Sequence, residues 1–208
     1  MTRSARTRIP PAPPWVRAIL AVVLIGGPAW GLLQWHGRVV NEHRLGAIAS
    51  QIAGRHVAVH CPGVLGRALR YDIVEGTVQF DADGRPADET KLRAFPCAEL
   101  DALAEGRRAA VLDCVARAGD CGKAEDDLAV AIDVLTHESF HLAGYADEAA
   151  AECHSLQTMA WTAQQLGVAP EVAQRLAAWE ANHAYLQMPA QYQGACVLDG
   201  QAASPAGR

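Results

Sequence analysis

The chain has 208 residues, of which 50% are hydrophobic and 20% are charged. This length allows one domain of ordinary size with an appendage, and the apolar content excludes disorder along the whole chain. Residues 1–44 carry six Arg and one Glu, a net charge of +5, whereas residues 45–208 carry a net charge of −10. An acidic main domain argues against nucleic acid as a partner, since phosphate binding requires a basic surface.

The N-terminal part of the sequence predicts a membrane anchor. Residues 1–14 are rich in Arg and Pro and are expected to form a cytoplasmic arm, and residues 15–35 carry no charge after Arg17. As a helix, this segment is long enough to cross the hydrocarbon core. Because the positive charges precede it, we expect a single-pass protein of the cell membrane with residues 36–200 outside. A signal peptide with residues 18–26 as its apolar core is the alternative, and its cleavage would give a secreted domain.

The first half of the exported domain is expected to contain the strands. Residues 38–53 predict a short amphipathic helix, and residues 57–61 predict a strand that ends at a Pro-Gly pair. Two further strands are predicted at residues 73–80 and 90–95. The turn-forming residues 81–86 between them indicate a hairpin.

The second half of the domain is expected to be helical. The pattern is helical from Cys97 to about Met188, and Pro189 is expected to end the last helix. Breaks are expected near Gly106, at residues 119–122, at Gly144 and at residues 167–170. The fold class is therefore α+β, a mostly helical domain with a small β-hairpin or sheet. Residues 201–208 are expected to be a disordered tail.

Six cysteines agree with export, because an even number in an exported domain is typical of disulfide bonding. No pair has the CxxC spacing of a cysteine zinc site. The short separation of Cys114 and Cys121 favours a local disulfide between them. One set that would complete the pairing joins Cys61 to Cys97 and Cys153 to Cys196.

Residues 137–141 read His-Glu-Ser-Phe-His, an HExxH motif. Residues four apart on a helix lie on one face, so the imidazoles of His137 and His141 could bind one ion, with Zn²⁺ as the expected cofactor. Glu138 lies on an adjacent face and could take a proton from a metal-bound water. The helix is apolar nearly all round, which predicts that it is buried, and two buried histidines without a partner would be unfavourable.

A second helix is predicted directly after this motif. Gly144 is expected to end the first helix, and Asp147 is a good N-cap for the next. Glu148 and Glu152 would then lie one turn apart on the same face. Like charges at this spacing repel each other, and a divalent cation beside them would replace the repulsion with binding.

The segment that contains these motifs resembles the zincin metallopeptidases, and is most similar to the gluzincin branch, which pairs HExxH with a glutamate on a following helix. The resemblance implies a zinc ion held by His137, His141 and Glu148. It also implies that Glu152 orients a histidine ring and that Glu138 is the general base in the attack of zinc-bound water on a peptide carbonyl.

The short gap between the two motifs leaves a second possibility for the third ligand. Only six residues separate His141 from Glu148, which is few for a gluzincin. The pattern HExxHxxGxxD, which ends at Asp147, resembles the metzincins and makes Asp147 the alternative metal ligand. No Met-turn accompanies it, because Met159 lies within a predicted helix and Met188 precedes a proline. Glu148 is therefore the favoured ligand.

The function implied by this resemblance is that of a membrane-anchored extracytoplasmic zinc peptidase, which acts on a peptide or protein substrate. One alternative is an inactive, zinc-stabilised exported domain that binds a protein partner. Another is a disulfide-bonded domain in which HExxH occurs by chance. Near the C-terminus, His183, Tyr185 and Tyr192 are candidates to donate a hydrogen bond to a developing oxyanion.

Overall fold

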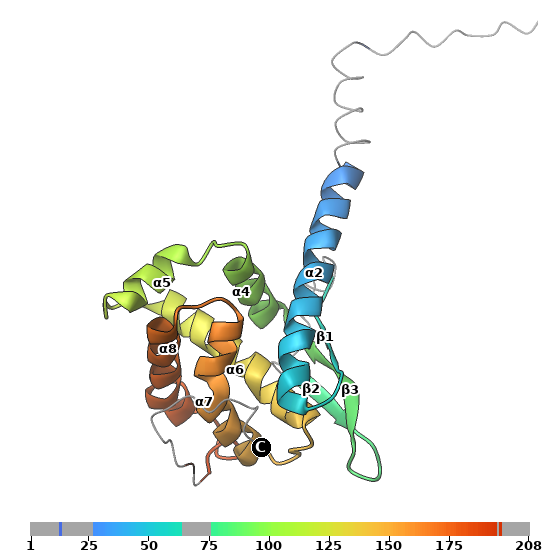
Figure 1. Cartoon of the computed structure of the whole chain (residues 1–208), viewed down its shortest axis with the longest axis vertical. Coiled ribbons are helices and arrows are strands. Elements are labelled where there is room, and N and C mark those ends of the chain that lie inside the picture. Colours follow the sequence, from blue (N-terminus) through green and yellow to red (C-terminus); the bar gives the residue numbers. More distant parts are fainter. Residues whose placement is uncertain (1–12, 14–26, 64–75, 195, 197–208) are drawn as a thin grey trace, which may run out of the picture. The chain divides into compact units, whose positions relative to one another are not determined.

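The chain divides into two compact units, residues 1–39 and residues 40–208. The second unit is mostly helical and contains a small three-stranded sheet, in agreement with the predicted α+β class (Figure 1). The computed structural model describes residues 13, 27–63, 76–194 and 196.

Much of the predicted membrane anchor lies outside the described residues. This holds for residues 15–26 of the segment 15–35, and also for nearly all of the arm 1–14 and for the tail 201–208. Helix α2, Gly27–Ala53, begins within the predicted anchor. In the part of the chain that the structure describes, no helix is both long enough and apolar enough to cross a membrane.

The elements after α2 follow in an order close to the predicted one. They are β1 Ala58–His60, β2 Gly76–Phe80, β3 Pro86–Leu92, α4 Ala94–Ala104, α5 Ala109–Ala116, α6 Lys123–Leu142, α7 Glu148–Gln165, α8 Pro170–Asn182 and the 3₁₀-helix η2 Tyr185–Gln187. The predicted helix over residues 38–53 is the second half of α2. Its apolar residues Leu45, Ile48 and Ile52 are buried in the core.

The sheet has the strand order β1-β3-β2, so β2 is an edge strand. β3 pairs with β2 in an antiparallel arrangement, as the hairpin prediction requires, and with β1 in a parallel one. The predicted limits of the third strand, residues 90–95, were wrong. The strand begins at Pro86, which pairs with Phe80, because pairing with β2 outweighs the low β propensity of residues 86–89.

Helix α6 forms the centre of the unit. It contacts α4, α7, α8 and the strands β2 and β3, and it runs between these elements in Figure 1. Its residues from Leu128 to Leu142 are almost all buried, including the two histidines of the HExxH motif. Packing on most sides of a helix restricts its side chains, so the buried His137, Glu138 and His141 are held in fixed directions.

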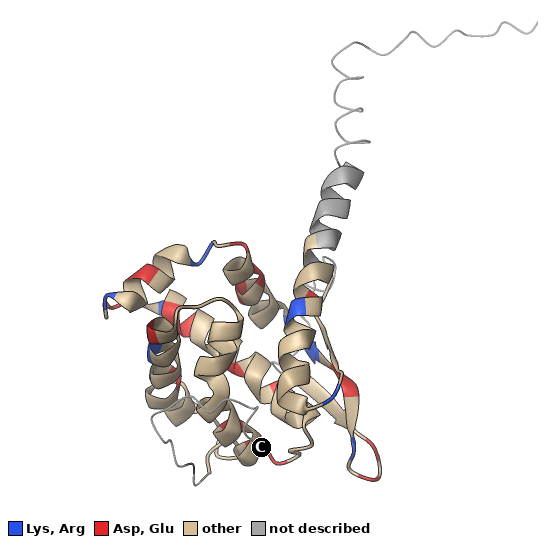
Figure 2. Cartoon of the chain, viewed as in Figure 1, with Lys and Arg blue, Asp and Glu red and all other residues tan. Residues whose placement is uncertain are grey.

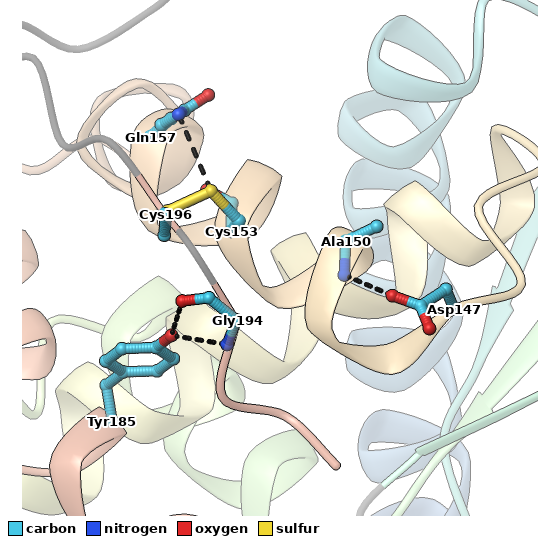
Figure 3. The surroundings of a disulfide bond; sticks show 7 residues. All are labelled: Asp147, Ala150, Cys153, Gln157, Tyr185, Gly194 and Cys196. Atoms are coloured by element: carbon cyan, nitrogen blue, oxygen red, sulfur yellow. Dashed lines mark hydrogen bonds between the residues drawn. A yellow bond between two sulfur atoms is a disulfide. The ribbon is translucent and has the colours of Figure 1, made fainter. Parts of the chain in front are cut away.

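The chain reverses direction between α6 and α7 at Gly144. This residue has a φ of 105°, a conformation that other residues rarely adopt. The side chain of Asp147 accepts a hydrogen bond from the backbone N–H of Ala150 at 2.9 Å and so caps α7 (Figure 3). The reversal brings the first turn of α7 beside the last turns of α6.

The last helix is shorter than the sequence indicated. It ends at Asn182 rather than at Pro189, and the chain continues through η2 and a series of turns. The ring of His183 stacks on that of Trp179 one turn earlier, with centroids 4.9 Å apart. Helical spacing therefore persists to His183, although the regular α-helix has already ended.

Three disulfides connect these elements, and the predicted pairing is confirmed. Cys61–Cys97 joins the residue after β1 to α4, and Cys114–Cys121 joins α5 to the loop before α6. Cys153–Cys196 joins α7 to the C-terminal segment. Disulfides of this number are typical of proteins that fold in an oxidising, extracytoplasmic compartment.

Candidate metal centre

Helix α6 places two imidazoles side by side. His137 and His141 lie one turn apart and are 7% and 6% exposed. Their Nε2 atoms are 2.9 Å apart, and the two rings are nearly perpendicular to each other. Both nitrogens are shielded from solvent, and they are close enough to bind the same cation.

The first turn of α7 adds a carboxylate to this pair. Oε2 of Glu148 lies 3.1 Å from Nε2 of His137 and 3.2 Å from Nε2 of His141. These three atoms therefore form a nearly equilateral triangle. In a tetrahedral zinc site with ligand bonds of about 2.0–2.1 Å, neighbouring ligand atoms are about 3.3–3.4 Å apart. The group could thus hold a metal ion after an outward shift of a few tenths of an ångström.

The other nitrogen of each ring has its own partner. Nδ1 of His137 lies 2.8 Å from Oε2 of Glu152, which is 1% exposed, and Nδ1 of His141 lies 2.6 Å from the backbone oxygen of Tyr145. Both partners are acceptors, so the rings carry their protons on Nδ1. When the rings are neutral, this tautomer leaves the Nε2 lone pairs free for a metal ion.

The alternative ligand Asp147 has a different place. Its carboxylate caps α7, one residue before Glu148, and it is not part of the group of possible metal ligands. Glu148 begins the helix, and its side chain is 39% exposed.

The acidic side chains around His137 raise its pKa. Burial alone lowers the pKa of His137. The hydrogen bond that His137 donates to Glu152, with the charges of Asp133, Glu152 and Glu138, outweighs burial and raises the pKa to about 9. Without a metal ion, a proton on His137 therefore balances part of the surrounding negative charge at neutral pH.

Glu138 lies beside the histidines with its side chain 5% exposed. Its carboxylate accepts a hydrogen bond from the hydroxyl of Thr90 on β3 at 3.2 Å. Burial raises the pKa of Glu138, while the charges of His137 and His141 act in the opposite direction. A raised pKa suits a carboxylate that must take up and release a proton.

A cleft of about 870 Å³ opens in front of these residues. Its walls come from β2, α6, α7, α8 and the chain after α8. Thr77, Val78 and Phe80 line it from the edge strand β2, and Trp179 lines it from α8. No Lys or Arg is among the described residues that line the cleft, whereas acidic positions recur along α6 (Figure 2).

Residues 184–194 with Cys196 are here called the C-terminal strap, and several of them line a further side of the cleft. The hydroxyl of Tyr185 donates to the backbone oxygen of Gly194 at 3.2 Å and accepts from its N–H at 3.1 Å (Figure 3). A Cβ atom at Gly194 would lie 3.0 Å from Cβ of Ala149, so glycine allows the strap to lie close to α7. The Cys153–Cys196 disulfide fixes the far end.

The strap brings Tyr192 to the metal centre. The ring of Tyr192 lies 5.7 Å from that of His137, measured between centroids, and it lines the cleft. Burial raises the pKa of Tyr192, and the charge of Glu148 raises it further, so its hydroxyl stays protonated at neutral pH. Of the three oxyanion candidates, the other two have local partners, because Tyr185 binds Gly194 and His183 stacks on Trp179.

Two residues next to the site were missed by the sequence analysis. Thr90 and Gly76 contact Glu138 from strands β3 and β2, although they lie 48 and 62 positions away in the sequence. Neither belongs to a motif, so only the register of the sheet could have identified them.

Comparison of the chain with the profiles of known protein families gave no match, and neither did comparison with curated proteins or with solved structures.

Proposed function

We propose that this protein is an extracytoplasmic zinc-dependent peptidase. The observation that supports it is the triangle of His137 Nε2, His141 Nε2 and Glu148 Oε2, with sides of 2.9–3.2 Å, beside the buried carboxylate of Glu138. Two imidazoles and one carboxylate with a further open position are the donor set of catalytic zinc sites. When bound, zinc would acidify the attacking water and polarise the peptide carbonyl.

Glu138 is the proposed general base. Its carboxylate takes a proton from the attacking water and passes it to the amine that leaves. The cleft holds Glu138 away from bulk solvent, which favours this transfer because the neutral acid is stabilised by burial. Glu152 and the backbone oxygen of Tyr145 hold the two imidazoles in the orientation that a metal ion requires.

Two other features of the cleft suit a peptide substrate. β2 is an edge strand that lines the cleft, so an extended peptide could pair with its backbone by β-augmentation. The protonated hydroxyl of Tyr192 is the proposed donor to the oxyanion that forms at the attacked carbonyl. The membrane anchor at residues 15–35 stays a prediction from the sequence.

The test begins with metal analysis of the purified exported domain, followed by cleavage of an unfolded generic protein with and without a chelator. We expect about one zinc per chain and cleavage that stops on chelation. Glu138→Gln should retain zinc and lose hydrolysis, whereas Glu171→Gln, at an exposed position in the first turn of α8, should retain both. Zinc without cleavage in the unaltered protein would instead favour an inactive, zinc-stabilised domain.

A further inference from the structure

The side chain of Glu138, the proposed general base, contacts the β-sheet as well as its own helix α6. Oε2 of Glu138 lies 3.2 Å from the hydroxyl of Thr90, which is 1% exposed on the central strand β3. The same hydroxyl lies 3.1 Å from the backbone oxygen of Thr77 on β2. A buried hydroxyl between a carboxylate and a backbone oxygen ties the position of Glu138 to the pairing of β2 with β3.

The edge strand also contacts Glu138 directly. A Cβ atom at Gly76 would lie 2.4 Å from both Cδ and Oε1 of Glu138, so a side chain there would force the Glu138 carboxylate to move. Gly76 is buried, and its φ is not in the left-handed region, so its backbone conformation is open to other residues. Glycine at this position therefore leaves the space that the Glu138 side chain occupies.

We propose that Thr90 and Gly76 form a seat that holds the Glu138 carboxylate at the metal centre, with Thr90 as a positioning residue. This inference rests on the proposed peptidase function, and it assigns a role to two residues outside the HExxH motif. Thr90 binds Oε2, while Gly76 leaves room for Cγ, Cδ and Oε1, so contacts from two strands fix the place of the Glu138 carboxylate.

The hydroxyl of Thr90 lies within hydrogen-bond distance of both Glu138 and the backbone of β2. It has one proton and two lone pairs. When Glu138 is ionised, Thr90 can donate to Oε2. The same hydroxyl can rotate to donate to the backbone oxygen of Thr77 instead. Valine has the same shape without the hydroxyl, and serine keeps the hydroxyl without the methyl group.

The experiment compares Thr90→Val with Thr90→Ser in the zinc-loaded protein, by metal content, kcat and KM on a peptide cut by the unaltered protein. We expect full zinc in both variants. Thr90→Val should lower kcat by about 10- to 100-fold with KM within about twofold, because a small displacement of a general base is costly. Thr90→Ser should restore most of kcat. Equal kcat in Thr90→Val and the unaltered protein, or an equal loss in both variants, would overturn the proposal.

Crystal structures of the same zinc-loaded proteins test the seat without relying on catalysis. The Glu138 carboxylate should keep its place in the unaltered protein and in Thr90→Ser, and should leave it in Thr90→Val. An unmoved carboxylate in Thr90→Val would reject the seat even if cleavage is observed. If the carboxylate moves in Thr90→Val but the unaltered protein cleaves no peptide, the seat is supported and the proposed peptidase function is rejected.

Gly76→Ala provides a second variant if Thr90→Val fails to fold. The added methyl group must displace Glu138, so zinc should stay bound while kcat falls by about 10-fold or more. Gly37→Ala is the matched control, because nothing lies within 4 Å of a Cβ atom built there. Gly76→Ala with unchanged kcat would contradict the proposal.

Discussion

The Nδ1 atom of His137 lies 2.8 Å from Oε2 of Glu152, a residue one turn after Glu148 on α7. The two carboxylates of α7 therefore contact the same imidazole, one at each nitrogen. Because Glu152 is almost fully buried, its charge acts on His137 with little screening by solvent. The charge of Glu152 would make Nε2 of this imidazole a stronger electron-pair donor to a bound metal ion.

Glu152→Gln should weaken zinc binding without abolishing it. The amide can still accept a hydrogen bond from Nδ1 of His137, but it carries no charge, and loss of such a partner lowers metal affinity by about 10- to 100-fold. Competition with a chromogenic chelator measures the affinity. Glu171→Gln on α8 is the control and should bind zinc like the unaltered protein. Equal affinity in both variants would show that Glu152 does not support the metal centre.

The raised pKa of His137 predicts a proton release when metal binds. In the metal-free protein this pKa is about 9, against an ordinary value of 6.5, so the charged imidazole stabilises the fold. That stabilisation is complete below pH 6.5 and is lost as the pH rises through 9. Zinc requires the neutral ring, so its apparent affinity should rise by up to about tenfold per pH unit up to about pH 9.

Calorimetric titration with zinc in buffers of different ionisation enthalpy counts the released protons. At neutral pH we expect about one proton from His137, and fewer in Glu152→Gln, because that variant lacks the hydrogen bond and charge that raise the pKa. Zinc binding with no proton release at neutral pH would mean that His137 is already neutral in the metal-free protein.

Local spacing was enough to bring together the three residues that could hold a metal ion, but not the residues that contact Glu138. His137 and His141 share a face because they are four residues apart, and Glu148 follows because Gly144 and Asp147 determine where α7 begins. These relations lie within a dozen residues of one another. The Cys114–Cys121 disulfide is also local, because the two cysteines are only seven positions apart, whereas the spacing did not determine the other two pairs.

The contacts of Glu138 depend on pairing over long distances in the sequence. Thr90 reaches Glu138 only because β3 lies between β1 and β2, with Thr90 opposite Val78 on one side and Val59 on the other. The hydrophobic pattern placed the start of this strand at Thr90 instead of Pro86, so the register could not be derived. Tyr192 likewise reaches His137 through the strap, whose path depends on the Cys153–Cys196 bond.

Loss of the Cys153–Cys196 disulfide should affect activity more than metal binding. Replacing both cysteines by serine frees the end of the strap that carries Tyr192, while all three possible metal ligands lie on α6 and α7. We expect zinc content to remain and kcat to fall, as expected for loss of a donor to the oxyanion. The free energy of unfolding should fall by up to about 4 kcal/mol, since this bond closes a long loop.

The Cys114–Cys121 disulfide is the matched control. It closes a loop of seven positions outside the cleft, so its removal should lower the free energy of unfolding by about 2 kcal/mol or less and leave kcat unchanged. Steady-state kinetics and denaturant unfolding of both double variants separate the two effects. Unchanged kcat without Cys153 and Cys196 would show that the strap keeps Tyr192 in place without its disulfide.

Asp147 and Glu148 are neighbours with different predicted roles, and a pair of substitutions separates them. Glu148→Gln removes a charged oxygen from the ligand triangle, so zinc affinity should fall by more than about 100-fold, beyond the loss expected for an outer partner. Asp147→Ala removes the cap of α7 and should lower the free energy of unfolding by about 1 kcal/mol with zinc affinity unchanged. If zinc were lost only from Asp147→Ala, Asp147 would be the third ligand. Its carboxylate would then bind the metal ion instead of accepting a hydrogen bond from the N–H of Ala150.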